Sequence, residues 1–142
     1  MRQEEVCCDE SGYLDIFSRY RHCFCPGKII FLRGSMGTGK TTFVRKVCDE
    51  LVVDDLVSSP SFALLNVYNT SAFRIAHLDL FRLDAAHQLE DIGALDFLDK
   101  HTLVFVEWPD NCAGFFPQAD LDITFDFAAE DGLRRVVIRE AS

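Results

Sequence analysis

The segment with the clearest chemistry is GSMGTGKT, which runs from Gly34 to Thr41 and fits the pattern G-x-x-x-x-G-K-[ST]. Two glycines at this spacing let the backbone curl around an anion, so that successive N–H groups point at phosphate oxygens. In such a loop Lys40 reaches the β- and γ-phosphates, and the Thr41 hydroxyl binds Mg²⁺. We therefore predict a site for ATP and magnesium. The residues expected to bind the nucleotide here are Ser35, Met36, Gly37, Thr38, Gly39, Lys40, Thr41 and Thr42.

Two acidic residues at the ends of apolar runs could complete this site. A P-loop needs an acid that holds magnesium, usually at the end of a buried strand beside the first strand. Glu107 ends the run LVFVE and fits this requirement, with an ordinary surface acid as the alternative. Asp79 ends the run RIAHLD and is a second candidate, although an Asp at a strand end is often a cap or turn residue.

A third segment near the site is VSSPSF at residues 57–62, where hydroxyl side chains surround a proline. Proline favours a defined, extended path for the chain around it. The segment could sense the γ-phosphate as a switch does, or it could be a Ser-rich connecting loop.

The elements around the loop occur in the order that such a site requires. Residues 28–32, KIIFL, form a continuous apolar run, which is typical of a strand buried on both faces. The segment after Gly39 places Phe43, Val47 and Leu51 four residues apart, which predicts an amphipathic helix. Strand, glycine loop and helix are thus expected to follow one another directly.

Further elements are expected on both sides of this unit. A short helix with apolar residues at Leu14, Phe17 and Tyr20 follows a cap at Asp9. The other expected elements are strands at 62–68, 73–78, 103–106 and 121–127, helical turns within 85–98, and a strand at 136–139 that pairs with 121–127 across a turn at 131–132. This pattern predicts one α/β P-loop NTPase domain over residues 1–142. Its sheet should be mixed and mainly parallel, flanked by helices, with an antiparallel C-terminal strand pair.

Composition limits the class of protein. The chain has 142 residues, of which 49% are hydrophobic, and a formal net charge of −9. This apolar content can enclose one core, and so acidic a chain lacks the basic face that tight nucleic-acid binding requires. The N-terminus has no apolar segment of signal-peptide length, and no run approaches the roughly 18 residues of a membrane span. We therefore expect a cytoplasmic protein without membrane contact.

The six cysteines are expected to be reduced thiols, because the cytosol opposes structural disulfides. Cys7 and Cys8, with Cys23, Cys25 and His22, could be imagined as a metal site. Their spacings lack the paired C-x-x-C geometry of a zinc site, so burial as small apolar side chains is the favoured interpretation.

Four motifs, taken in order, resemble those of the TsaE family, the P-loop ATPase component of the bacterial machinery that makes threonylcarbamoyladenosine in tRNA. They are GSMGTGKTTF at 34–43, SPSF at 59–62, HLDLFRL at 77–83 and VEWP at 106–109, and the resemblance runs from about residue 9 to residue 136. The chain departs from the family's usual S-P-T-[FY] at Ser61, which keeps the hydroxyl. It also departs from H-x-D-x-Y-R at Phe81, which loses the phenol.

The resemblance implies roles for individual residues. Thr41 and Glu107 would hold Mg²⁺, and Asp79 would lie near the γ-phosphate to position or deprotonate the attacking water. Lys40, Asp79 and Glu107 would then be the catalytic residues. Asp9 and Gly132 would also border the nucleotide pocket. Asp9 could equally be a helix cap, and Gly132 could equally belong to a hairpin turn.

Two further side chains near these motifs have open roles. Trp108 follows the proposed metal-binding acid and is the one tryptophan of the chain, yet it could equally be a core or interface aromatic. Arg82 could neutralise transition-state charge, or that charge could be met by a partner protein.

The resemblance also implies an activity and its partners. The protein would be a Mg-dependent ATPase, weak when alone, that acts on a complex of TsaB-like and TsaD-like proteins. It would reach tRNA only through that complex, which agrees with the acidic composition. Two other functions stay open. One is a small-molecule kinase, although a kinase should carry an arginine-rich lid, and Arg134, Arg135 and Arg139 lie at an expected strand instead. The other is a scaffold that holds nucleotide without hydrolysing it. A GTPase would need an N-K-x-D motif, which the sequence lacks.

Overall fold

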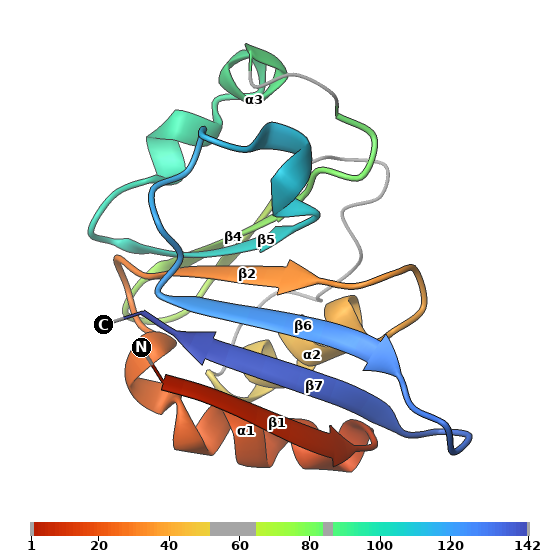
Figure 1. Ribbon diagram of the computed structural model, residues 1–142. Helices are drawn as coiled ribbons and strands as arrows, with labels where there is room; N and C mark the ends of the chain where they lie inside the picture. Colours follow the sequence, from red (N-terminus) through yellow and green to blue (C-terminus); the bar gives the residue numbers. More distant parts are fainter. Residues whose placement is uncertain (1, 52–64, 84–86, 142) are drawn as a thin grey trace.

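Seven strands form one mixed sheet in the part of the chain that the structure, a computed structural model, describes: residues 2–51, 65–83 and 87–141. The strands are β1 (Arg2–Cys8), β2 (Ile29–Arg33), β3 (Leu65–Asn69), β4 (Arg74–Asp79), β5 (Thr102–Glu107), β6 (Leu121–Phe127) and β7 (Arg134–Glu140). They lie in the order β1-β7-β6-β2-β5-β4-β3 (Figure 1). The four central strands, β6, β2, β5 and β4, are parallel to one another, and the outer pairs are antiparallel. The predicted α/β class with a mixed, mainly parallel central sheet is confirmed.

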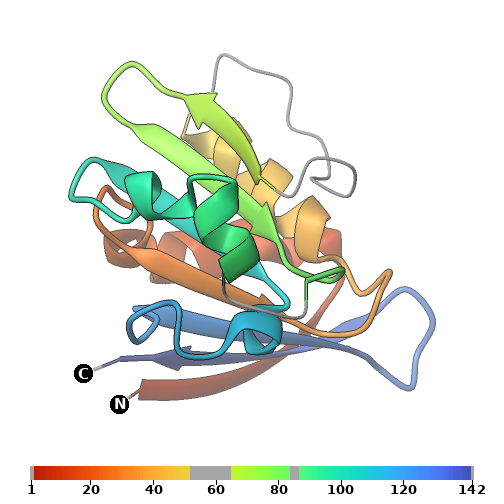
Figure 2. The same cartoon turned by 90° about the horizontal axis from the view of Figure 1, so that it is seen from above.

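Helices cover both faces of this sheet. The α-helices are α1 (Tyr13–Arg19), α2 (Lys40–Glu50) and α3 (His87–Asp91), and the 3₁₀ turns are η1 (Glu10–Gly12), η2 (Arg21–Cys23), η3 (Ala94–Phe97) and η4 (Pro109–Cys112). Figures 1 and 2 show α1 and α2 on one face and α3 with η3 on the other. Buried apolar side chains form one cluster under α1 and α2 and a second cluster under α3 and η3. The sheet is therefore the middle of three layers.

The parallel strands at the centre position the residues that the sequence singled out. All six residues of β5 are buried, as expected for a parallel strand that has helices over both faces. Leu32 at the end of β2 is paired with Glu107 on β5, and Glu107 is paired with Asp79 on β4. The carboxyl ends of three neighbouring strands thus bring both predicted acids to the edge where the glycine loop begins.

The C-terminal strands follow the predicted pattern. Leu121, Ile123 and Phe125 of β6 are buried, while the residues between them are partly exposed. β7 returns antiparallel to β6, and the connecting turn contains Gly132 with a φ of 81°. The half-exposed strand and its antiparallel partner are confirmed.

The strand β1 was not predicted from the sequence. None of its residues is buried, so it carries no apolar periodicity that would distinguish it from a polar N-terminal segment. It is held by antiparallel pairing with β7, in which Val6 lies opposite Val136. The C-terminal strand pair therefore becomes a three-stranded antiparallel edge, and the N- and C-terminal ends of the described chain lie side by side (Figure 1).

Phe17 and Tyr20, two of the three apolar residues predicted for the first helix, are buried. Tyr13, Ile16 and Phe17 are its buried residues, whereas Leu14 is 37% exposed. The Tyr13 ring packs edge-on against Phe43 of α2, at 5.5 Å between centroids. The prediction was wrong for Leu14 alone. The spacing around Phe17 also allows a stripe through Tyr13 and Ile16, and packing against α2 selects that stripe.

Two expected elements extend beyond the described residues. The strand expected at 62–68 is described from residue 65 as β3, and the helical turns expected within 85–98 are described from residue 87 as α3 and η3. The SPSF motif at 59–62 lies outside the described residues. Within the described ranges, no helix combines the length and the apolar character that crossing a bilayer requires.

Candidate functional site

The loop between β2 and α2 depends on its two glycines. Gly34 and Gly39 have φ angles of 135° and 107°, in the left-handed region. A Cβ atom on Gly34 would collide with the carbonyl oxygen of Phe125, and one on Gly39 would collide with the Tyr13 side chain. Both positions therefore require glycine. Gly39 is also the N-cap residue of α2, and the unpaired N–H groups at this helix end favour a bound anion.

A cleft of about 630 Å³ opens over this loop and over the carboxyl ends of the central strands, a volume typical of small-molecule sites. Its lining includes ten residues that the sequence analysis singled out: Asp9, Met36, Gly37, Gly39, Lys40, Thr41, Thr42, Asp79, Glu107 and Gly132. It also includes Glu10, Ser11, Tyr13, Phe81, Arg82, Trp108 and Arg134. The fold thus gathers the predicted nucleotide, catalytic and metal residues around one cavity, although they come from five separate parts of the chain.

Two of the predicted nucleotide-binding residues, Ser35 and Thr38, do not line the cleft. The Thr38 side chain is fully buried, and its hydroxyl donates to the Ser35 carbonyl oxygen at 2.7 Å. This hydrogen bond ties the loop to itself. Thr38 can therefore act on a phosphate only through its backbone N–H group, whereas Ser35 is exposed at the surface of the loop.

The Lys40 side chain points back into the loop. Its side chain is only 5% exposed, its Nζ donates to the Gly34 carbonyl oxygen, and Nζ lies 4.1 Å from the centroid of the Trp108 ring. Burial lowers the pKa of Lys40, and the nearby carboxylates of Glu107 and Asp79 oppose that shift. The ammonium group thus contacts the Gly34 carbonyl oxygen and the Trp108 ring, and an anionic ligand can replace these contacts.

Glu107 is the centre of a buried polar group. Its Oε2 accepts a hydrogen bond from the Thr41 hydroxyl at 3.2 Å and lies 2.6 Å from Nε2 of His77. His77 is fully buried, and its Nδ1 has no hydrogen-bond partner within the described ranges. This arrangement favours the tautomer that carries its proton on Nε2, because the one available donor then reaches the carboxylate. Sequence reasoning gave His77 no role, since its partner lies 30 residues away.

Thr41 and Glu107 have the ligand chemistry that Mg²⁺ requires. A hydroxyl and a carboxylate are hard oxygen donors, and these two face each other at 3.2 Å on the wall of the cleft. Magnesium in phosphate-binding proteins is held by one or two such side chains together with substrate phosphates and water. The residues at the site therefore fit the ion that the sequence predicts.

Asp79 faces the cleft from the end of β4. Burial raises the pKa of Asp79, and the hydrogen bond that Oδ1 accepts from the Phe81 N–H at 3.0 Å opposes that shift. The residue therefore caps a turn, which was the alternative interpretation, and it also lines the cleft beside Glu107. Asn111 of η4 fixes the same turn by donating from Nδ2 to the carbonyl oxygens of Leu80 and Phe81, at 2.7 and 3.1 Å.

An aromatic pair forms one wall of the cleft. The rings of Phe81 and Trp108 lie 4.9 Å apart, and Phe81 is 44% exposed. Trp108 has a φ of 59°, the one positive φ of a non-glycine residue in the described chain, and such strain is often found at functional sites. This conformation places the ring over the Lys40 ammonium group. Trp108 thus lines the cleft and also packs, partly buried, against the apolar cluster under α3 and η3.

Arg134 is a cleft residue that sequence reasoning missed. Its Nε donates to the Thr38 carbonyl oxygen at 3.1 Å, and its guanidinium carbon lies 4.8 Å from the centroid of the Phe127 ring. The first residue of β7 therefore contacts the backbone of the P-loop directly. The expected position of Gly132 beside the pocket was the available signal, because Arg134 lies two residues further along the same hairpin.

The turn before α1 lines the cleft beside Arg134, because Cys8 at the end of β1 is paired with Arg134. Asp9 Oδ1 accepts hydrogen bonds from the N–H and the hydroxyl of Ser11, at 3.0 and 2.5 Å, and these bonds lower the pKa of Asp9. Asp9 thus caps η1 and lines the cleft at once. Tyr13 completes this part of the cleft, and burial raises its pKa to about 12, so it stays a neutral hydrogen-bonding group.

The cysteines do not gather into the site that could be imagined from their sequence. Cys7 and Cys8 end β1 opposite Arg135 and Arg134, at the other end of β7 from η2, which contains Cys23. Of the four cysteines in that imagined site, Cys23 is buried as favoured, whereas Cys7 is exposed and Cys8 and Cys25 are half-buried. Cys48 and Cys112, elsewhere in the chain, are also buried.

Comparison with known proteins gives consistent matches. The family profile described as "Threonylcarbamoyl adenosine biosynthesis protein TsaE" matches residues 9–136. The protein named tRNA threonylcarbamoyladenosine biosynthesis protein TsaE from Borreliella burgdorferi is 34% identical over 101 residues, which cover 70% of this chain and 73% of that protein. The protein of the same name from Haemophilus influenzae is 31% identical over 99 residues, which cover 70% of this chain. That match spans 63% of the Haemophilus protein, less than two thirds of its length.

A solved structure has a similar fold. The crystal structure of YdiB from Bacillus subtilis superposes with a TM-score of 0.77 and covers 99% of this chain and 87% of its own. The two sequences are 22% identical, so this likeness supports the fold alone.

Proposed function

The chain belongs to the TsaE family of threonylcarbamoyladenosine biosynthesis proteins, and from this premise we propose that it binds and hydrolyses ATP as a subunit of the tRNA-modifying machinery. The observation that carries the proposal is the convergence of Lys40, Asp79 and Glu107 on one cleft over the glycine loop. We further propose that residues 1–142 act as one P-loop domain in the cytoplasm.

The glycine loop and the start of α2 bind the phosphates in this mechanism. Backbone N–H groups and the positive end of the helix dipole attract the anion, and Lys40 exchanges the Gly34 carbonyl oxygen for the phosphate oxygens. Thr41 and Glu107 would hold Mg²⁺, and the bound ion would supply charge neutralisation at the phosphates. His77 keeps the Glu107 carboxylate oriented through the hydrogen bond to Oε2.

Asp79 orients the attacking water in this mechanism and accepts its proton. Its partly desolvated carboxylate suits that task, because a raised pKa makes the group a better base than a fully exposed aspartate. Arg82 and Arg134 line the same cleft and supply positive charge near the phosphates. Phosphoryl transfer then depends mainly on positioning and charge neutralisation.

The partners in this proposal are TsaB-like and TsaD-like proteins. The acidic chain, with a net charge of −9, reaches tRNA only through them. Activity of the chain alone is expected to be weak, because the partners complete or order the site.

The proposed function is tested by measuring phosphate release from ATP with the purified chain alone and with TsaB-like and TsaD-like proteins added. We expect weak release alone and a clear increase with both partners, which should also be recovered in a pull-down with ATP present. Transfer of labelled phosphate to a small molecule would support a kinase instead. Recovery of no TsaD-like partner would count against the proposal.

The role of His77 can be tested separately. His77→Leu removes the hydrogen bond to Glu107 at similar side-chain volume, so we expect about a tenfold higher Mg²⁺ concentration to be needed for ATP binding. His77→Gln can still donate to the carboxylate and should lie closer to the unmodified protein. His101→Gln, at an exposed histidine, is the control. A folded His77→Leu variant with unchanged Mg²⁺ dependence would exclude this positioning role.

A further inference from the structure

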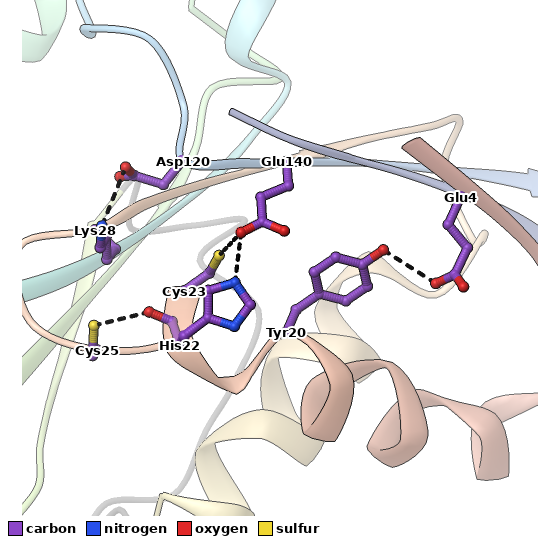
Figure 3. A network of polar contacts seen from close by, with 8 residues as sticks. All are labelled: Glu4, Tyr20, His22, Cys23, Cys25, Lys28, Asp120 and Glu140. Carbon is purple, nitrogen blue, oxygen red and sulfur yellow. Dashed lines mark hydrogen bonds and ion pairs between the residues drawn. The ribbon is translucent and has the colours of Figure 1, made fainter. Parts of the chain in front are cut away.

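A second group of polar side chains lies at the other end of β7 from the cleft. It consists of His22 and Cys23 in η2 and Glu140, the last residue of β7 (Figure 3). Among the described residues, these three are the one group of His, Cys, Asp or Glu whose possible ligand atoms all lie within 4.8 Å of one another. The proposed ATPase mechanism uses none of them.

The three side chains already meet at one carboxylate oxygen. Oε2 of Glu140 lies 2.5 Å from Nε2 of His22 and accepts a hydrogen bond from the Cys23 thiol at 3.7 Å. Cys23 is buried and the Glu140 side chain is 19% exposed, so both are held by their surroundings, whereas the His22 side chain is 59% exposed. The Cys23 thiol, the Glu140 carboxylate and the more exposed His22 ring thus hold three possible ligand atoms within 4.8 Å of one another.

The spacing of the Cys23 and Glu140 donors matches tetrahedral coordination. With metal–sulfur and metal–oxygen distances typical of zinc, a tetrahedral site places the sulfur and oxygen ligands about 3.5 Å apart. The Cys23 sulfur and the Glu140 oxygen are 3.7 Å apart in the metal-free protein. The nitrogen and oxygen ligands should be about 3.3 Å apart, so the His22 ring must move outward by roughly 0.8 Å from Glu140. Its exposure to solvent permits that movement.

Two basic residues lie near the group, and each is held by another side chain. Arg2 is paired with Glu140 in the register of β1 and β7, and its guanidinium carbon lies 4.7 Å from the centroid of the Tyr20 ring. Lys28 is the basic residue drawn beside the group in Figure 3, and its Nζ is paired with Asp120 at 3.7 Å. Cys25 also lies nearby, but its thiol donates to the backbone carbonyl oxygen of His22 at 3.3 Å and is not a member of the group.

We propose that His22, Cys23 and Glu140 bind one divalent transition-metal ion of the zinc type, with water in the remaining position. An imidazole, a thiolate and a carboxylate are the donors that zinc takes in proteins, and hard ions such as Mg²⁺ do not select a thiolate. The site is separate from the Mg²⁺ ligands in the cleft.

The position of the site assigns the ion a structural task. η2 follows α1, whereas β7 pairs with both β1 and β6. A metal bound here ties the helical layer to the antiparallel edge of the sheet, across 117 residues of sequence between Cys23 and Glu140. Because the ion binds only the folded arrangement, it stabilises the native state without entering the chemistry of the cleft.

The test is titration of the purified, reduced and nucleotide-free chain with Zn²⁺ by calorimetry, followed by titration with Co²⁺ as a spectroscopic probe. We expect one equivalent to bind, and the Co²⁺ complex to show a thiolate charge-transfer band. Excess zinc at about a hundred times the dissociation constant should raise Tm by roughly 5 to 10 °C.

Matched variants identify the ligands. Cys23→Ser and Glu140→Gln should each weaken Zn²⁺ binding at least about tenfold and remove the zinc-dependent rise in Tm. Cys25→Ser changes a neighbouring thiol outside the group and should bind like the unmodified chain, as should Cys7→Ser on the far end of β1. Glu140→Gln keeps the side-chain shape, so a loss of binding in this variant with an unchanged metal-free Tm cannot be ascribed to unfolding.

Two results would overturn the proposal. One is Zn²⁺ binding that is unaffected by both Cys23→Ser and Glu140→Gln, and the other is a Co²⁺ complex without a thiolate band. Neither result bears on the proposed ATP hydrolysis, because that reaction is assigned to the cleft at the opposite end of the sheet and is measured by phosphate release.

Discussion

Asp79→Ala is expected to abolish ATP hydrolysis while leaving ATP binding intact. Asp79 lines the cleft beside Glu107, its Oδ1 accepts a hydrogen bond from the Phe81 N–H, and it acts on Lys40 only through its charge. Its removal therefore leaves Lys40 and Thr41 in place. Loss of a general base lowers the rate by roughly 10²- to 10⁴-fold. The measurement is phosphate release in the presence of the TsaB-like and TsaD-like partners, with ATP affinity determined on the same preparation.

Two further variants separate chemistry from structure at this position. Asp79→Asn keeps a hydrogen-bond acceptor for the Phe81 N–H at 3.0 Å and lacks only the charge, so it should preserve the turn and still lose hydrolysis. Asp49→Asn, on the exposed face of α2, is the matched control and should hydrolyse ATP normally. Unchanged phosphate release by Asp79→Asn would remove this residue from the mechanism, whereas an unmodified chain that binds ATP without hydrolysing it would indicate a scaffold.

Lys40→Met is expected to weaken ATP binding itself. The ammonium group is the positive charge at the base of the loop, and hydrogen bonds to charged groups contribute enough that its removal should raise Kd roughly 10- to 150-fold. Methionine keeps an apolar stem against the Trp108 ring, so packing on the cleft wall is largely retained. Calorimetric titration with ATP and Mg²⁺ measures the effect.

The single tryptophan supplies an independent readout for this variant. Lys40 Nζ lies 4.1 Å from the Trp108 ring centroid, and ATP should draw it away toward the phosphates. We therefore expect the intrinsic fluorescence of the unmodified chain to change on ATP binding, and the change to be largely absent in Lys40→Met. Lys46→Met, on the same helix, should behave like the unmodified chain. An unaltered Kd in Lys40→Met would contradict the phosphate role of this residue.

Asp79→Ala removes a negative charge from the cleft, whereas Lys40→Met removes a positive one. The cleft holds Lys40 against the carboxylates of Asp79 and Glu107, and each side shifts the pKa of the other. Asp79 lies among these charges without binding the phosphate, so its loss should leave affinity unchanged or increase it. Lys40 attracts the phosphate directly, and its loss should reduce affinity.

Much of the site could be predicted from sequence because it is local. The pattern from Gly34 to Thr41 determines its own backbone conformation. The observed positive φ angles of Gly34 and Gly39 show why glycine is needed at both positions. The apolar run before Glu107 likewise predicted a buried strand, which β5 is. Local patterns of this kind need no knowledge of which strands become neighbours.

Other features depend on contacts between distant segments. The edge strand β1 has no fully buried residue, and it is placed by hydrogen bonding to β7 and by the packing of half-buried Val6 and Cys8 against the core. The apolar face of α1 was chosen by packing of Tyr13 against Phe43. Neither the strand conformation of β1 nor the buried face of α1 can be predicted from the apolar periodicity of its own segment.

The sequence alone therefore determined the phosphate loop, the strand before it and the helix after it, because these follow from short-range backbone geometry and apolar spacing. Tertiary structure decided which side chains share a site. The register between β4 and β5 brings His77 and Asp79 to Glu107, the hairpin after β6 brings Arg134 to the P-loop, and the end of β7 brings Glu140 to Cys23. The physical reason is that strand order and register are set by the packing of the whole sheet, which no local pattern encodes.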